Sequence, residues 1–230
     1  MMLAFDSATD RLTIALGTGD NVAAEINEDA PRAHLTRLLP GINDLVIETA
    51  LDLADIDYIV VGTGPGSFTG LRIAVATAQG LAHGLDRPLI GVSTLDAMAA
   101  ALAPAAENNE IYPVIDAKRQ EVFTAGYDSH GRRLTDYRAL RPQALADQLA
   151  AGGKTVLMAG DGLAKYSSLF ADKLGAAVIF AEASLWPPRA SVLIRLAEEK
   201  IDKGEVGAYF NVLPIYVRLP DAEEAVKRAK

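Results

Sequence analysis

The apolar and polar positions of the first half of the chain change period as the chain proceeds. Three short apolar-rich runs come first, separated by polar turns, and such runs predict antiparallel strands. The runs cover residues 2–7, 12–17 and 21–26. From 32 to 50 the apolar residues recur at helical spacing, which predicts one long helix although Pro40 and Gly41 lie inside it. The chain therefore opens as a strand meander that leads into a helix.

Strands and helices then alternate up to a polar break. The predicted order is a strand at 58–61, a helix at 70–84, a strand at 88–92 and a helix at 93–102. This alternation is typical of a parallel sheet with covering helices. Residues 104–109 are polar and helix-breaking, which indicates a boundary between two lobes.

Beyond the break the opening pattern returns. Val114-Ile115-Asp116-Ala117 followed by Val122-Phe123-Thr124-Ala125 repeats the order of Ala4-Phe5-Asp6-Ser7 followed by Leu12-Thr13-Ile14-Ala15. Each pair reads as strand, aspartate-bearing turn, strand. A duplicated lobe is one interpretation, and a chance similarity between two apolar hairpins is the alternative.

The rest of the second half again alternates. We expect a strand at 133–140, a helix at 142–150, a strand at 155–159, a short helix after 160–162, a strand at 177–180 and a helix at 189–203. The chain is thus predicted to be an α/β protein with a first lobe at 1–106 and a smaller second lobe at 107–230, each a mixed sheet with flanking helices. Its charged end, 221–230, is expected to fray.

The glycine-rich segment after the strand at 58–61 is the strongest candidate for chemistry. Gly64, Gly66 and Gly70 allow close backbone approach, and the start of a helix offers N–H groups to an anion. A Walker A loop requires lysine and a hydroxyl residue after its last glycine, whereas Leu-Arg follows here. A dinucleotide fingerprint fits the spacing poorly. A phosphate-binding turn of the actin, hexokinase and Hsp70 kind and a purely structural turn both remain open.

Two aspartates end the first strand of each lobe. In two-lobed ATPases, carboxylates at such places position metal or phosphate, but a short carboxylate also accepts hydrogen bonds from its own turn. The turn after Asp6, at 7–9, contains no glycine that would let a phosphate approach. We therefore favour the structural interpretation for Asp6 and for Asp116.

Other catalytic patterns are missing from the sequence. His34, His83 and His130 are the three histidines, and none forms the i, i+4 pair of a helical zinc site. His34, near a helix start, is expected to be exposed or to cap the helix. Ser67 and Ser93 lack the setting of a nucleophile elbow. No catalytic, cofactor-binding or metal-binding residue is predicted.

Composition narrows the functional class further. The 230 residues carry a net charge of -8 with scattered lysines and arginines, which disfavours independent binding of nucleic acid. The chain has no cysteine, which excludes disulfides and thiolate sites. No apolar run approaches the roughly 20 residues of a membrane span. A cytoplasmic location is the simplest interpretation.

Two helices of the first lobe are apolar over more than one face. Such helices must be covered both by their own sheet and by something else, and small residues along the helix at 70–84 would let a partner helix approach. The alternative is that the two helices cover only the sheet and one another. The residues predicted to form a partner interface are Leu38, Ile42, Leu45, Ile73, Thr77 and Leu81.

These motifs together resemble the TsaB (YeaZ) family, the bacterial partner proteins in tRNA threonylcarbamoyladenosine synthesis. The matching segments are 3–9, His34 with 38–40, 64–73, 78–82, 91–95, 115–119, 121–122 and 214–218. The run Gly-Pro-Gly-Ser-Phe-Thr-Gly-Leu-Arg at 64–72 is the most specific of them.

The resemblance implies a two-lobed fold like the actin and Hsp70 ATPases (the ASKHA fold), with a shortened second lobe. It implies a non-catalytic subunit that binds a TsaD-type catalytic subunit through first-lobe helices, with a TsaE-type ATPase joining the complex and tRNA bound only through it. Homodimers would use similar helices. An autonomous ATPase or small-molecule kinase of the same fold is the first alternative, and a peptidase is the second.

Overall fold

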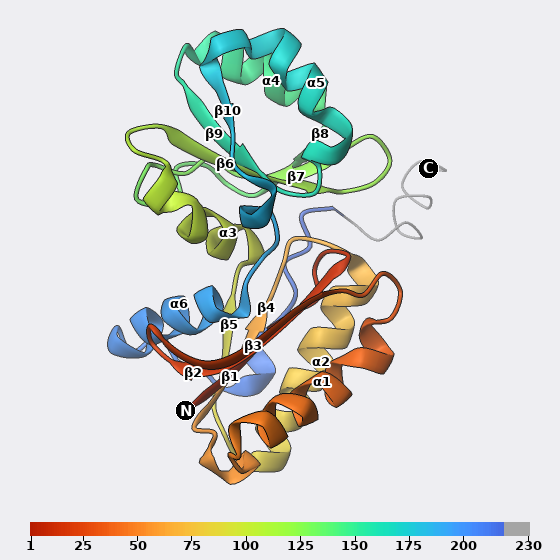
Figure 1. Ribbon diagram of the computed structural model, residues 1–230, viewed down its shortest axis with the longest axis vertical. Coiled ribbons are helices and arrows are strands. Elements are labelled where there is room, and N and C mark those ends of the chain that lie inside the picture. Colours follow the sequence, from red (N-terminus) through yellow and green to blue (C-terminus); the bar gives the residue numbers. More distant parts are fainter. Residues whose placement is uncertain (219–230) are drawn as a thin grey trace.

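The computed structural model of the protein describes residues 1–218, which form two lobes joined near the middle of the molecule (Figure 1). Each lobe is built on one five-stranded sheet. Within the described residues, no helix is both long and apolar enough to cross a membrane. The expectation for 221–230 falls outside the described part of the chain.

The first sheet has the strand order β3-β2-β1-β4-β5. Its strands are β1 (Met2–Asp6), β2 (Arg11–Thr18), β3 (Asn21–Asp29), β4 (Tyr58–Gly62) and β5 (Leu89–Val92). The first three are antiparallel neighbours, while β4 runs parallel to β1 and β5 parallel to β4. The predicted meander and the predicted parallel portion are therefore both confirmed.

The second sheet has the order β10-β9-β6-β7-β8. Its strands are β6 (Glu110–Asp116), β7 (Val122–Thr124), β8 (Arg138–Leu140), β9 (Val156–Ala159) and β10 (Val178–Phe180). Here too the first three strands are antiparallel and the last two join in parallel. The two sheets have the same topology, and β6 takes the place in the second sheet that β1 takes in the first. The strand expected at 133–140 is confined to its last three residues.

Helices cover the sheets on both sides. They are α1 (His34–Thr49), α2 (Phe68–Leu85), α3 (Thr94–Leu102), α4 (Pro142–Gly152), α5 (Leu163–Leu174) and α6 (Ala190–Asp202). Short 3-10 turns lie at Leu53–Asp55, Ala103–Ala105, Gly175–Ala177, Ala183–Leu185 and Tyr209–Asn211. Figure 1 shows α1 and α2 on one face of the first sheet and α4 and α5 together on the second lobe. As predicted, α1 continues through Pro40.

Two helices depart from the lobe boundary expected at residue 106. The helix α3 precedes this boundary, yet its Leu95 and Leu102 share a core cluster with Ile111 of β6 in the second lobe. Although it belongs to the second half of the chain, α6 packs on the first sheet, where Leu193 and Ile194 are buried with Ala4 of β1 and Val60 of β4. The apolar stripe of α6 matches the face of the first sheet that α1 and α2 leave uncovered. Within the described residues, the chain therefore does not divide at the expected bounds 1–106 and 107–230: the stretch 107–180 supplies the second sheet, and α6 then returns to the first lobe.

Candidate functional site at the glycine loop and the interlobe cleft

The glycine loop joins β4 to α2 at the edge of the first lobe that faces the second. The strand ends at Gly62, and α2 begins at Phe68 after the N-cap Ser67. The Ser67 side chain accepts a hydrogen bond from Gly70 N over 3.3 Å, which satisfies one of the free N–H groups of the first helical turn. The loop thus fixes both the start and the direction of α2.

The hollow of the loop is filled by the turn between β1 and β2. Ser67 N donates to Ala8 O over 2.7 Å, and Ser7 Oγ donates to Gly70 O over 2.9 Å. A Cβ atom on Gly66 would lie 2.3 Å from Ala8 O, and one on Gly70 would lie 2.0 Å from Ser7 O. Glycine is required at both places because the chain's own backbone makes the close approach that a phosphate would make in a cradle.

The other side of the loop is held by the start of α3. Gly64 O accepts hydrogen bonds from Thr94 N (2.9 Å) and from Ser93 Oγ (3.0 Å). Gly64 N donates in turn to Thr94 Oγ1 over 3.1 Å. The loop is therefore clamped between the first hairpin and α3. Its backbone groups at Gly64 and Ser67 are already used.

Asp6 is completely buried beside this clamp. Its carboxylate accepts hydrogen bonds from Ala8 N and from Thr94 Oγ1, each over 2.6 Å. Burial raises the pKa of Asp6, and the two hydrogen bonds oppose that effect only in part. The hydrogen bond from its own turn, which the structural interpretation of Asp6 expects, is present. Thr94, which links Asp6 to the loop, was not singled out from the sequence.

Asp116 occupies the matching position in the second lobe and is held by two lysines. Its carboxylate accepts from Lys118 N at 3.0 Å and lies 2.6 Å from Lys165 Nζ and 3.3 Å from Lys118 Nζ. Burial alone would raise the pKa of Asp116, but the hydrogen bonds from both lysines outweigh it and lower the pKa. Asp161 Oδ1 accepts from Asp116 N over 2.8 Å, and burial raises the pKa of Asp161.

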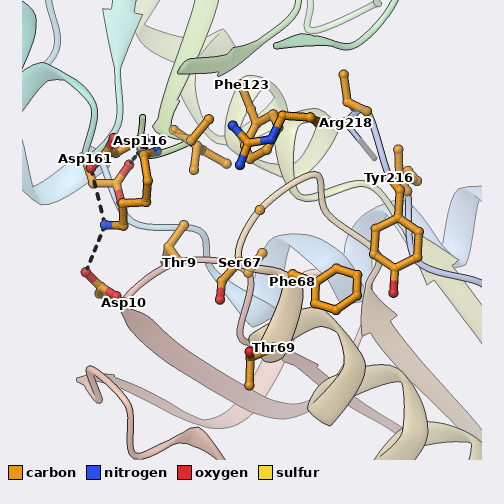
Figure 2. Close-up of a pocket in the computed structure, with 17 residues that line it drawn as sticks. Thr9, Asp10, Ser67, Phe68, Thr69, Asp116, Phe123, Asp161, Tyr216 and Arg218 are labelled. Carbon is orange, nitrogen blue, oxygen red and sulfur yellow. Dashed lines mark hydrogen bonds and ion pairs between the residues drawn. The ribbon is translucent and has the colours of Figure 1, made fainter. Parts of the chain in front are cut away.

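A cleft of about 490 Å³ separates the two aspartate-bearing turns and is lined by both lobes (Figure 2). Phe68, Phe123 and Tyr216 contribute to its apolar wall, as Figure 2 shows. Of the described lining residues, the two cations are both paired: Lys118 with Asp116 and with Asp10 at 3.8 Å, and Arg218 with Glu121 at 2.9 Å. An anionic ligand would have to compete with these carboxylates.

The histidines do not gather at the cleft. His34 is buried, with Nε2 2.9 Å from Thr9 O, so the expectation that it is exposed or caps the helix was wrong. From the start of α1, His34 instead contacts the turn between β1 and β2 through Thr9 O. Across residues 1–218, no group of three or more His, Cys, Asp or Glu side chains is arranged to hold a metal ion.

The residues predicted for a partner interface divide into two sets. Leu38, Ile42 and Leu45 are buried in the first-lobe core, so this part of the prediction is corrected: their side chains face the sheet. Ile73, Thr77 and Leu81 are half-buried on α2. The apolar side chains that α1 exposes are instead Leu35 (73 % exposed), Leu39 (54 %) and Ile47 (70 %).

Comparisons with known proteins agree with this architecture. A family model described as TsaD, tRNA N6-adenosine threonylcarbamoyltransferase, matches residues 22–226. The chain is 30% identical over 223 residues to the tRNA threonylcarbamoyladenosine biosynthesis protein TsaB of Escherichia coli K12, with 94% of each chain covered. The solved structure of YeaZ from Pseudomonas aeruginosa has a TM-score of 0.78 at 31% identity, covering 94% of this chain and 98% of that one.

A more distant likeness concerns the fold alone. A solved chain of the PilM-PilN type IV pilus biogenesis complex has a TM-score of 0.51 at 13% identity, covering 87% of this chain and 98% of that one. The predicted two-lobed α/β fold, with a mixed sheet and flanking helices in each lobe, is confirmed. By its similarity over nearly the whole chain to TsaB of Escherichia coli and to YeaZ of Pseudomonas aeruginosa, the protein belongs to the TsaB (YeaZ) family.

Proposed function

We propose that this chain is the non-catalytic scaffold and activating subunit of a bacterial tRNA N6-threonylcarbamoyladenosine transferase complex. It binds a TsaD-type catalytic subunit, a TsaE-type ATPase joins the complex, and tRNA is contacted only through the assembly. Family membership supports the pathway. The observation that carries the scaffold role is the glycine loop, whose hollow is filled by Ser7 and Ala8 of the chain itself.

The chemistry of the cleft supports a non-catalytic role. The Ser67 N–H, which a phosphate-binding turn would offer, donates to Ala8 O. Lys118 and Arg218, the described cations of the lining, are paired with carboxylates. A nucleotide would gain little from groups that are already satisfied. Strong binding of ATP by the isolated chain, measured by calorimetry, would favour the alternative of an autonomous ATPase or kinase.

The exposed face of α1 and α2 is the surface proposed for the partner. Leu35, Leu39 and Ile47 follow one another at multiples of four residues, so they form a stripe along α1. On α2 the half-buried Thr77 lies between the exposed Ala76 and the buried Ala78, and small side chains there allow close approach of a second helix. The same surface would serve a homodimer when the catalytic subunit is absent.

Size-exclusion chromatography with a TsaD-type protein from the same genome tests the proposal. The parent chain is expected to co-elute with it, and Leu39→Asp to weaken the association about tenfold or more, as charges buried in interface cores do. Leu134→Asp is a matched control because Leu134 is equally exposed, at 54 %, but lies in the second lobe. Separate elution of the parent proteins, with normal tRNA modification after deletion of the gene, would refute the proposal. A tRNA-modifying role also implies a cytoplasmic location.

A further inference from the structure

The segment that follows α6 returns across the cleft and touches both lobes. Figure 1 shows it passing between the upper end of α2 and the second lobe. It carries the 3-10 turn Tyr209–Asn211 and continues without helix or strand to Arg218, the last described residue. Residues 215–218 are part of the lining of the cleft.

Its first half is anchored on the first lobe. Tyr209 and Val212 pack against the core beneath α2. Gln79 Nε2 donates to Val212 O over 3.0 Å, and Ile215 N donates to Thr63 O over 2.8 Å. These two hydrogen bonds, one from a side chain and one from the backbone, hold the segment on the strand-to-helix unit that carries the glycine loop.

Gly91 of β5 makes room for this anchor. A Cβ atom at this position would lie 2.9 Å from Val212 Cγ1 and 2.9 Å from Thr63 Cγ2, closer than side chains pack without moving. Val212 therefore packs in the space that a side chain at Gly91 would occupy. A methyl group added there would displace the segment from the first lobe.

In the middle of the segment, Tyr216 packs on the start of α2. Its ring lies 5.2 Å from the ring of Phe68, centre to centre, and its hydroxyl accepts from Arg72 Nε over 3.1 Å. The Arg72 guanidinium also lies 3.9 Å above the Phe68 ring. The three side chains form one contiguous group at the exposed start of α2, in which the two rings are tilted by 36°.

The end of the segment is anchored on the second lobe. Val217 packs against the core cluster that contains Ile115 and Phe123 of the second sheet. Arg218 Nη1 lies 2.9 Å from Glu121 Oε2, and both side chains are partly shielded from solvent. The direct ion pair across the cleft, Lys118 with Asp10, is exposed on both sides, so it contributes little.

We propose that residues 209–218 form an interlobe strap that fixes the separation of the two lobes across the cleft. The polypeptide crosses between the lobes elsewhere through α3 and through residues 181–189, which can act as pivots while the strap closes the cleft side. The strap packs on Phe68 and Arg72. A partner that contacts the start of α2 would therefore shift the strap and alter the opening of the cleft. The inference concerns the isolated chain and stands independently of the proposed partner.

Distances between two spin labels, measured by pulsed electron resonance, test the strap directly. The chain has no native cysteine, so Glu48→Cys on α1 and Ala144→Cys on α4 place one label on the exposed surface of each lobe. The parent is expected to give one narrow distance distribution. The double variant Val217→Ala with Arg218→Ala is expected to add a second population at longer distance, since it removes the second-lobe anchor.

Two further variants keep the test decisive. Gly91→Ala, which acts at the other anchor, should produce the same longer population. Arg132→Ala, which removes an exposed ion pair inside the second lobe, should leave the parent distribution unchanged. Circular dichroism confirms that each variant is folded, and Arg218→Ala alone replaces the double variant if that variant is not. A parent-like distribution in the folded anchor variants would overturn the strap.

Discussion

The N–H group of Ser67 donates to the carbonyl oxygen of Ala8 over 2.7 Å, and this bond determines how the glycine loop is used. The loop has the glycines of a phosphate cradle, yet Gly66 and Gly70 make their close approach to Ala8 O and Ser7 O of the same chain. The glycines at 66 and 70 are thereby explained as a requirement of packing. The loop orients α2, whose exposed face is the surface proposed for the partner.

Gly70→Ala is expected to lower the free energy of unfolding by about 2–3 kcal/mol, because the added methyl would meet Ser7 O, a backbone atom that cannot move aside. Urea unfolding measures the change. Gly80→Ala is the control within the same helix: nothing lies within 4 Å of its added Cβ, so it should stabilise the chain by about 0.5–1 kcal/mol. Equal stability of Gly70→Ala and the parent would contradict the packing role.

Thr94→Val is expected to destabilise the fold by about 1.5–3 kcal/mol, the range for a lost hydrogen bond to a charged group. The hydroxyl of Thr94 donates to Asp6 Oδ2 and accepts from Gly64 N, so valine removes this partner from both buried groups, while Asp6 Oδ1 keeps its bond from Ala8 N. Thermal or urea unfolding provides the measurement. Thr69→Val, at an exposed position in the first turn of α2, should cost far less. A similar cost for the two variants would argue against the Asp6 to Gly64 link.

Asp6→Asn is expected to make the stability of the fold less sensitive to rising pH. Burial raises the pKa of Asp6, so the stability linked to its protonated form is complete below the ordinary aspartate pKa of about 4 and is lost as the pH rises through the folded value. Asparagine has no such loss. The stability of the variant relative to the parent should therefore increase with pH in urea titrations. A difference that stays constant from acid to neutral pH would disprove this assignment.

Lys165→Met is expected to raise the pKa of Asp116, whose carboxylate lies 2.6 Å from Lys165 Nζ. Since the pKa of Asp116 is lowered in the folded chain, its contribution to stability is present above the ordinary aspartate pKa and is lost as the pH falls through the folded pKa. This pH dependence is the reverse of that of Asp6. Carboxyl NMR shifts recorded against pH give the value. Lys154→Met, in the same lobe but paired with Glu110, should leave Asp116 unchanged. An unaltered Asp116 titration in Lys165→Met would contradict the pairing.

The sheets and most helices could be predicted from the sequence because periodicity reports local burial directly. The pattern could not show which sheet a helix covers: α6 is amphipathic, and only the tertiary structure places it on the first sheet. Nor could it decide between neighbouring leucines. Leu38 is buried and Leu39 exposed, and because 38 and 39 are adjacent on a helix that is apolar on several faces, a small rotation exchanges them.

The loop could be assessed only in part from sequence. Comparison with known motifs showed that the catalytic lysine is absent, but the contacts of the loop depend on a turn that comes 63 residues earlier in the chain, where Ser7 bonds to Gly70. Thr94 was missed because a threonine at a helix start is common and its second role, donating to the buried Asp6, requires the three-dimensional structure. The strap was missed for the same reason, since the residues 209–218 show neither helical nor alternating periodicity.

The return of α6 to the first sheet has a consequence for synthesis of the chain. Ala4 and Val60 lie on strands made early, yet the face they share is covered by a helix that starts only at Ala190. Until that helix has left the ribosome, one face of the first sheet has no cover and stays open to other apolar surfaces. The first lobe therefore reaches its final form only after the strands of the second sheet have been made.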